Sequence, residues 1–306
     1  MAKQGQSREV EVDGRTVGLT NLQKVLWPQA EFTKAQAIDY YARIAEVMLP
    51  HLKDRPLTRV RFPDGVESQR FFEKRAPKHT PNWVKTAPIE MGTAGVLDFI
   101  ICNDRATLIW LAQLAALELH PSLARRQKPE RPTVLAFDLD PGAPATAVEC
   151  AQIALRLRDL FASFELECFP KHSGSKGIQV YVPLNTAVTY EQTKSYSRAV
   201  AQALEKAEPD LVVSKQKKEL RKGKVLVDWS QNDYSKTTVA VYSLRCRDQP
   251  WASCPLTWDE VADLADGGDP ASVRFLSSEV LERVEKHGDL FAPVLELKQK
   301  LPKTPA

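Results

Sequence analysis

Two aspartates at the end of an apolar run have the clearest chemical potential in this sequence. Asp138 and Asp140 follow Val134–Phe137 and are stopped by Pro141-Gly142. On a strand, residues i and i+2 lie on the same face, with Cα atoms roughly 6.6 Å apart. Two divalent cations about 3.5–4 Å apart need bridging carboxylates. The pair therefore indicates a divalent-cation site, although an isolated Asp-x-Asp is more often a strand end that meets solvent.

A glycine-rich turn and a third strand end add groups that suit a triphosphate. Ser173–Gly177 has the sequence Ser-Gly-Ser-Lys-Gly and precedes the alternating strand Ile178–Val182. Such a turn presents backbone N–H groups and the ammonium of Lys176 to phosphate oxygens. Asp228 ends the apolar run Val225–Val227 and could supply a third carboxylate. Taken alone, Asp228 would be interpreted as a strand-end cap.

These segments together resemble the polymerase domain of bacterial ligase D and its stand-alone relatives, including the Prim-PolC proteins of the archaeo-eukaryotic primase superfamily. The three segments are Phe137–Gly142, Ser173–Gly177 and Val227–Asn232. The resemblance covers nearly the whole chain, with further matches at Leu19–Pro28, Thr33-Lys34, Phe71–Lys74 and Glu118–Pro121. It implies an α+β, two-lobed primase-polymerase fold with a recognition-motif-like catalytic sheet.

The resemblance also implies roles for individual residues. Asp138, Asp140 and Asp228 would be catalytic and would hold two Mn²⁺ or Mg²⁺ ions. The residues implied in binding the nucleoside triphosphate are Ser173, Lys176, Gln179, Arg245 and His120. The residues implied in contacting DNA are Asn21, Lys24 and Lys34 at a 5′-phosphate, Phe71 and Phe72 on template bases, and Arg221.

Several positions carry a second interpretation or depart from the family pattern. His120 could equally be a helix-terminal histidine, which a helix C-terminus stabilises. Gln179 stands where many members have His, and a glutamine can donate to phosphate but carries no charge. Ser122 replaces a common Trp and Val241 a common Pro. These changes weaken assignment to the ligase-fused branch more than they weaken the chemistry.

Composition limits the kind of nucleic-acid surface and the compartment. The 306 residues can form one large domain or two lobes, and a formal net charge of +3 excludes a globally basic protein. Cationic residues instead cluster locally, with six Lys or Arg among the ten residues of Lys215–Lys224. The five cysteines form no C-x-x-C pair, so no zinc site or disulfide framework is indicated. No signal peptide or membrane-spanning run is visible, which predicts a cytoplasmic, nucleoid-associated protein.

Periodicity predicts the elements that position these residues. Thr33 would cap a helix that buries Ile38, Tyr41, Ile44, Ala45 and Met48. Strands are predicted for Arg55–Phe62, from Thr133, and in segments ending at Asp228 and around Thr237–Ser243. Helices are predicted for Leu108–Leu119, about Ala145–Phe164 and about Glu191–Lys206, and the capping box Thr257-x-x-Glu260 would open another. This order fits a sheet with helices on one side.

We therefore expect one primase-polymerase domain over residues 1–306. Its N-terminal part (about 10–130) would bind DNA ends, its core (about 131–250) would be catalytic, and a helical segment (about 255–297) would follow. The polar ends, before about Val10 and after about Leu297, would be mobile.

The predicted function is a DNA repair polymerase that extends primers at gaps or double-strand-break ends and prefers ribonucleotides. The partners would be DNA with a gap or break and a 5′-phosphate, nucleoside triphosphates, and Ku with a separate ATP-dependent DNA ligase, because no ligase motif is visible. No membrane partner is expected. Two alternatives remain open: a glycosyltransferase that uses Asp138 and Asp140 to hold a metal–nucleotide–sugar, and a non-catalytic DNA-end-binding module.

Overall fold

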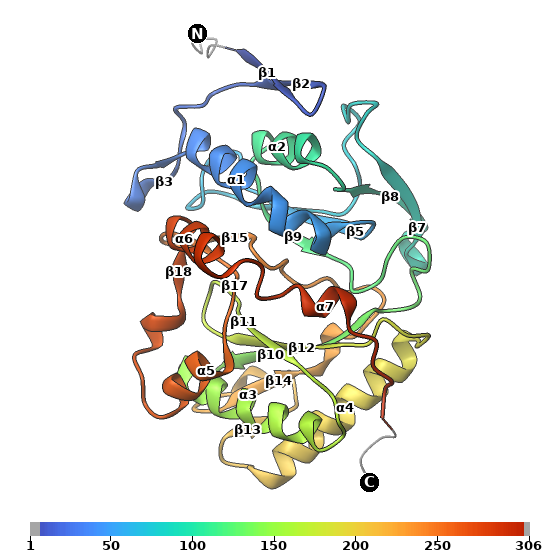
Figure 1. Cartoon of the computed structure of the whole chain (residues 1–306), viewed down its shortest axis with the longest axis vertical. Helices are drawn as coiled ribbons and strands as arrows, with labels where there is room; N and C mark the ends of the chain where they lie inside the picture. Colours follow the sequence, from blue (N-terminus) through green and yellow to red (C-terminus); the bar gives the residue numbers. More distant parts are fainter. Residues whose placement is uncertain (1–6, 303–306) are drawn as a thin grey trace.

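Two lobes stacked along the long axis make up the computed structural model, which describes residues 7–302 (Figure 1). Each lobe has its own main sheet and its own apolar core. The expected α+β, two-lobed class is confirmed. Within residues 7–302, no helix is long and apolar enough to cross a membrane.

The N-terminal lobe is an antiparallel sheet on which two helices pack side by side (Figure 1). Strands β6, β5, β8 and β7 neighbour one another in that order, and β9 also pairs with β5. The strands are β5 (Pro56–Arg61), β6 (Phe71–Glu73), β7 (Thr86–Glu90), β8 (Val96–Ile101) and β9 (Ala116–Pro121), and the helices are α1 (Lys34–Leu52) and α2 (Arg105–Gln113). Two hairpins precede them: β1 (Arg8–Val12) with β2 (Arg15–Leu19), and β3 (Val25–Trp27) with β4 (Phe32–Thr33).

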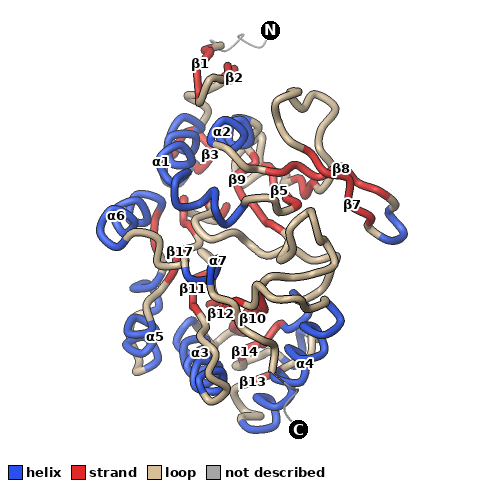
Figure 2. Tube along the Cα trace, turned by 45° about the vertical axis from the view of Figure 1, so that its right-hand side comes forward, coloured by secondary structure: helices blue, strands red, loops and turns tan. Residues whose placement is uncertain are grey.

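The C-terminal lobe is a six-stranded sheet with helices on one face, visible in both views (Figures 1 and 2). The strand order is β13-β14-β10-β12-β11-β17. The strands are β10 (Val134–Pro141), β11 (Phe169–His172), β12 (Ile178–Pro183), β13 (Val212–Val213), β14 (Val225–Asp228) and β17 (Cys254–Pro255). The covering helices are α3 (Ala147–Ala162), α4 (Tyr190–Ala207) and α5 (Trp258–Ala265).

The alternation along β10 decides which face is open to chemistry. Leu135, Phe137 and Leu139 lie in the core beneath the helices, whereas Ala136 joins the core of the N-terminal lobe. Because strand side chains alternate between faces, Asp138 and Asp140 continue the Ala136 face. The acidic end of β10 is therefore directed toward the space between the lobes.

The last third of the chain returns to the N-terminal lobe. Strands β15 (Leu244–Cys246), β16 (Pro250–Ala252) and β18 (Phe275–Leu276) form a small sheet. Helices α6 (Ser277–His287) and α7 (Pro293–Glu296) follow, and α6 packs against α1. Leu244, Val280 and Phe291 belong to the same core as α1, so residues far apart in sequence complete one lobe.

The helix signals with explicit caps are confirmed. Thr33 caps α1 with a reciprocal Gln36 contact, and all five residues predicted for its inner face are buried. Thr257 and Glu260 form the predicted capping box of α5. The helices expected near Ala145–Phe164 and Glu191–Lys206 are α3 and α4.

Two predicted elements are wrong. The helix expected over Leu108–Leu119 ends at Gln113, and Ala116–Pro121 is strand β9. A run that is buried on every side carries no periodicity that separates helix from strand. The strand expected around Thr237–Ser243 is irregular. Its N–H groups of Thr238 and Ala240 bond the β9 carbonyls of Pro121 and Leu119 instead.

The two ends were expected to be mobile. Residues 1–6 and 303–306 lie outside the described residues. Nearer the fold, Arg8–Val12 pairs as β1 with β2, and the Gln299 side chain bonds the carbonyls of Glu167 and Pro183. These inner parts of both ends are thus held against their lobes.

Candidate active site

A polar row crosses four strands of the C-terminal sheet on the face directed toward the N-terminal lobe. The register places Lys171 opposite Gln179, Gln179 opposite Asp138, and Asp138 opposite Asp228. Directly paired residues project from the same face of a sheet. Asp140, two residues along β10, shares that face. The topology therefore brings the three predicted carboxylates onto one surface.

Burial and neighbouring negative charge perturb Asp138 and Asp140. Burial, and next the charge of Asp140, raise the pKa of Asp138 to about 7. Burial and the charge of Asp228 also raise the pKa of Asp140. Like charges held close together ionise more readily when a counter-cation lies between them. Three hard oxygen donors without a thiolate fit Mg²⁺ or Mn²⁺.

Two of the three carboxylates, Asp138 and Asp228, accept hydrogen bonds from protein donors. Asp228 accepts from the side-chain amides of Gln216 (2.7 Å) and Gln231 (2.9 Å), and Asp138 accepts from Gln179 Nε2 at 3.0 Å. Within residues 7–302, no three His, Cys, Asp or Glu side chains are grouped so that they could hold a metal ion as they stand. A cation at this surface would have to replace some of these hydrogen bonds.

The Ser173–Gly177 turn is closed on itself and pressed against β10. Ser173 Oγ accepts from the N–H groups of Ser175 and Gly177, each at 3.3 Å. A Cβ at Gly177 would lie 2.0 Å from the carbonyl oxygen of Leu139, so only glycine fits this contact. Lys176 is exposed on the turn. The turn is thus anchored to the strand that carries the aspartates.

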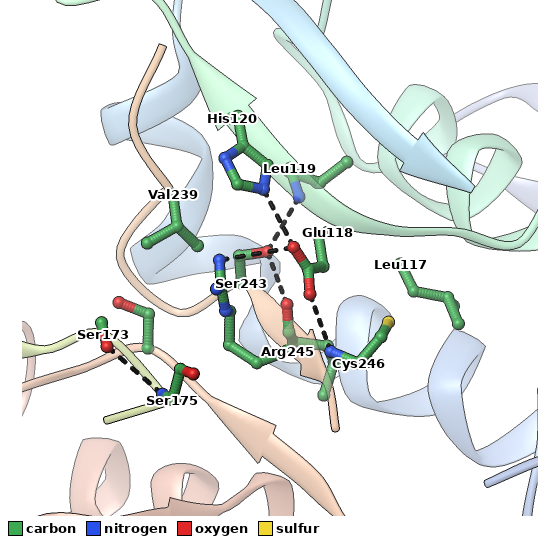
Figure 3. Close-up of polar contacts among 12 residues, drawn as sticks. Leu117, Glu118, Leu119, His120, Ser173, Ser175, Val239, Ser243, Arg245 and Cys246 are labelled. Atoms are coloured by element: carbon green, nitrogen blue, oxygen red, sulfur yellow. Dashed lines mark hydrogen bonds and ion pairs between the residues drawn. The ribbon is translucent and has the colours of Figure 1, made fainter. Parts of the chain in front are cut away.

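Arg245 and His120 meet at a buried glutamate (Figure 3). Glu118 accepts hydrogen bonds from His120 Nε2 (3.1 Å) and from the backbone N–H of Cys246 (2.9 Å), and Arg245 Nη1 lies 3.3 Å from it. The arginine also passes over Gly174, where a Cβ would lie 2.5 Å from Arg245 Cγ. His120 lies on strand β9, so its interpretation as a helix-terminal histidine is wrong.

Lys171 is a residue of this surface that sequence reasoning missed. It is fully buried, and its ammonium donates to Val239 O (3.1 Å) and Ser253 Oγ (2.8 Å). Burial lowers the pKa of Lys171 to about 7, while the charge of Asp138 opposes that shift. The sequence feature that could have indicated Lys171 is its position, two residues before the Ser173–Gly177 turn.

The residues expected at a DNA 5′-phosphate lie together in the N-terminal lobe. Lys24 N donates to Asn21 O (2.9 Å), and Lys34 N donates to Lys24 O (2.8 Å). Burial, followed by the charges of Lys24 and Arg61, lowers the pKa of Lys34 to about 8. Arg61 is therefore a further cation of this group that the sequence did not indicate. Lys24 also pairs with Asp64 at 2.8 Å.

Phe71 and Phe72 lie on the short edge strand β6 and are exposed, Phe72 by 62%. Because consecutive residues of a strand project to opposite faces, each ring is exposed on its own face of this edge strand. Arg221 lies in the basic segment and donates to Gln216 O at 2.6 Å and to Gln216 Oε1 at 2.8 Å. Since Gln216 in turn donates to Asp228, Arg221 connects to the carboxylates through one side chain.

Comparison with known proteins settles the family. Residues 33–291 match the model of the LigD primase-polymerase domain. The chain belongs to this family. It is 43% identical to the "Multifunctional non-homologous end joining protein LigD" of Mycolicibacterium smegmatis over 91% of this chain. It is 33% identical to the "Bifunctional non-homologous end joining protein LigD" of Bacillus subtilis over 88% of this chain.

A solved structure also matches most of the chain. The polymerase domain of Mycobacterium tuberculosis ligase D, solved in complex with DNA, superimposes with a TM-score of 0.85 at 42% identity. The match covers 91% of this chain and 98% of that one. By contrast, the chain spans only 36% of the M. smegmatis protein and 42% of the B. subtilis protein.

Membership of the LigD primase-polymerase family makes this chain a nucleotidyltransferase of the polymerase class. The family is metal-dependent, which agrees with the oxygen-rich surface on β10 and β14. The glycosyltransferase alternative rested on Asp138 and Asp140 alone. Family membership removes its support.

Proposed function

We propose that this protein is a repair polymerase that adds nucleotides to a primer at DNA gaps or double-strand-break ends. The observation that carries the proposal is the register that places Asp138, Asp140 and Asp228 on one sheet face, beside a glycine-rich turn pinned to the same strand. The relatives that share this domain are named as non-homologous end joining proteins.

In this proposal the three aspartates are the catalytic residues and hold two Mg²⁺ or Mn²⁺ ions. When bound, such ions would lower the pKa of the primer 3′-hydroxyl and neutralise the leaving pyrophosphate. The raised pKa of Asp138 supports this role. A bound cation would stabilise the ionised carboxylates that burial and mutual repulsion disfavour. Gln179 positions Asp138 through its 3.0 Å hydrogen bond.

The incoming triphosphate would lie over the Ser173–Gly177 turn. Exposed Lys176 and the guanidinium of Arg245 would contact its phosphates, because planar or mobile cations suit phosphate oxygens. Ser173 Oγ already accepts two N–H groups, so it would act toward the nucleotide as a hydroxyl donor. His120 would contact the nucleotide from the β9 side, and Gln179 would line the site between turn and aspartates.

The DNA would be held by both lobes. Asn21, Lys24 and Lys34 would bind the 5′-phosphate downstream of the gap, because clustered cations suit a terminal phosphate dianion. Exposed Phe71 and Phe72 would stack on template bases, and Arg221 would contact the backbone near the aspartates. Ku and a separate ATP-dependent ligase would be its partners, acting at broken DNA in the bacterial nucleoid.

A single assay tests this proposal. A labelled gapped duplex is incubated with Mn²⁺ or Mg²⁺ and with each ribo- or deoxynucleoside triphosphate. We expect templated and terminal extension that disappears in Asp228→Asn. A protein that binds the duplex tightly yet never extends it, with either ion, would be a DNA-end-binding module and not a polymerase.

The same assay tests sugar preference. We expect UTP or ATP to be added more efficiently than the matching deoxynucleotide, because Ser173 would pair with the 2′-hydroxyl. A site built to pair with a hydroxyl penalises its absence. Equal efficiencies in direct competition, with the metal held constant, would remove this claim, and Ser173→Ala should narrow the preference.

A further inference from the structure

Glu118 is a buried carboxylate to which no role is yet assigned, and it joins parts of the molecule that are remote in sequence. It lies on β9 in the N-terminal lobe, with its side chain only 10% exposed. It accepts hydrogen bonds from His120 on its own strand and from Cys246 on β15, which is 128 positions later in sequence. Within residues 7–302 it is the point where His120 and Arg245 share one partner (Figure 3).

We propose that Glu118 is a positioning residue of the nucleotide site, which fixes the tautomer of His120 and the direction of the Arg245 guanidinium. The nucleotide part of this inference rests on the proposed function. The part that concerns His120 rests only on the contacts of Glu118 and is testable without substrate.

The tautomer follows from donor and acceptor chemistry. An ionised carboxylate can only accept hydrogen bonds, so the proton between Glu118 and His120 must sit on Nε2 of the ring. Burial alone would raise the pKa of Glu118, but the hydrogen bond from His120 and the charge of Arg245 outweigh it and lower that pKa to about 2. Glu118 is therefore an anion throughout the physiological range.

The other ring nitrogen is left as an acceptor. Burial lowers the pKa of His120, and the contact with Glu118 offsets this only in part. The ring is therefore neutral, with a lone pair on Nδ1. Within residues 7–302, Nδ1 makes no hydrogen bond, and it is not among the buried unpartnered atoms. An unprotonated ring nitrogen repels phosphate oxygens but can accept a hydrogen bond from a hydroxyl. His120 therefore suits a sugar hydroxyl of the nucleotide.

The same carboxylate constrains Arg245. Glu118 holds Nη1, and the backbone of the next residue, Cys246, donates to the other carboxylate oxygen. The Arg245 stem is confined between this contact and Gly174. Its Nε is buried and makes no hydrogen bond, so among the described residues Glu118 is the charged partner that directs the guanidinium.

The test uses the full chain labelled with ¹⁵N in its five histidines. Long-range proton–nitrogen correlation identifies the protonated ring nitrogen, and His120→Gln assigns the His120 signal. We expect the Nε2–H tautomer in wild type. In Glu118→Gln the amide N–H₂ faces the former donors, so the Nε2–H preference should be lost.

Steady-state kinetics on a gapped duplex give the second readout. Glu118→Gln should raise KM for the nucleoside triphosphate about ten- to a hundredfold with a smaller change in kcat, because it disturbs charge-assisted contacts that orient the binding groups. The matched control is Glu260→Gln, which breaks a carboxylate–arginine pair with Arg283 away from the site. It should change neither KM nor the His120 signal.

The outcomes separate the two proposals. Absence of nucleotide addition by wild type contradicts the proposed function, while the tautomer measurement still decides the role of Glu118. A wild-type His120 protonated on Nδ1 overturns the inference, whether or not Glu118→Gln folds. A folded Glu118→Gln with wild-type KM and an unchanged His120 signal overturns it as well.

Discussion

At the scale of single residues, the chemistry of this site depends on strand register. Asp138 faces Gln179 on one neighbouring strand and Asp228 on the other. A slip of one residue would turn every side chain of a strand to the opposite face. The apolar residues of β10 bury their side chains under α3 and α4, and this burial fixes the register that holds the aspartates together.

Removing any one of the three carboxylates tests that arrangement. Asp138→Ala, Asp140→Ala and Asp228→Ala should each reduce nucleotide addition more than about a thousandfold, because a cation that stabilises the transferring phosphoryl charge contributes several kcal/mol. Binding of a gapped duplex, measured by fluorescence anisotropy, should stay near the wild-type value. Near-wild-type extension by Asp228→Ala would show that the third ligand is assigned wrongly.

Lys34 should make the binding of a 5′-phosphate by Asn21, Lys24 and Lys34 depend on pH. Its pKa is lowered to about 8 by burial and by the charges of Lys24 and Arg61. The protonated fraction therefore falls as pH rises through about 8, whereas an ordinary lysine stays charged to about pH 10. The affinity advantage of a 5′-phosphorylated gap should be largest below pH 8 and decline above it. Lys34→Ala should show a flat, small advantage, and a flat wild-type profile between about pH 7 and pH 9 would contradict this role.

At the scale of elements, the Ser173–Gly177 turn and strand β10 act as one unit. The turn touches the strand through backbone atoms at Gly177, with no side chain between them. A change at this contact must move the turn relative to Asp138 and Asp140.

Gly177→Ala tests this coupling. The added Cβ would meet the carbonyl oxygen of Leu139, so the turn must shift, at a cost of about 1–3 kcal/mol in the free energy of unfolding. We expect KM for the nucleoside triphosphate to rise about tenfold or more. Gly18→Ala on β2 is the control, since nothing lies within 4 Å of a Cβ there. Equal kinetics for the two variants would show that the turn does not set the position of the nucleotide.

The elements that sequence predicted well are those with local signals. Thr33 and Thr257 mark the starts of their helices because each forms a capping box with a residue three positions later. The one-sided apolar pattern of α1 likewise depends only on residues within that helix. The register pairs Asp138 with Asp228, which are 90 positions apart in sequence, so the segments could be recognised only through a family pattern. Glu118 and Lys171 were missed as site residues because their roles come from partners on other strands.

At the scale of the whole molecule, the groups proposed to hold a broken duplex lie in both lobes. The cationic group at Lys24 and Lys34 lies in the N-terminal lobe, and the three carboxylates lie on the C-terminal sheet. The segment 239–246 links the two lobes, since the N–H of Ala240 bonds Leu119 O on β9 and the carbonyl of Val239 accepts from Lys171 on β11. A substrate that touches both groups must present a 5′-phosphate and a primer end at once, as a short gap does.

This arrangement makes the 5′-phosphate the feature that separates repair from general polymerisation. Binding to a gapped duplex should be tighter when the downstream strand carries a 5′-phosphate, because each charge-assisted contact contributes about 1.5–3 kcal/mol at most, and less when exposed. The gain should fall steeply with salt. Lys24→Ala should erase most of it, whereas Lys206→Ala, an exposed lysine on α4, should not. Extension of a single strand by Lys24→Ala should stay unchanged, because Lys24 lies in the other lobe from the carboxylates. Equal binding of phosphorylated and hydroxyl-ended gaps by the wild type would place the protein among general primase-like polymerases, with no preference for broken ends.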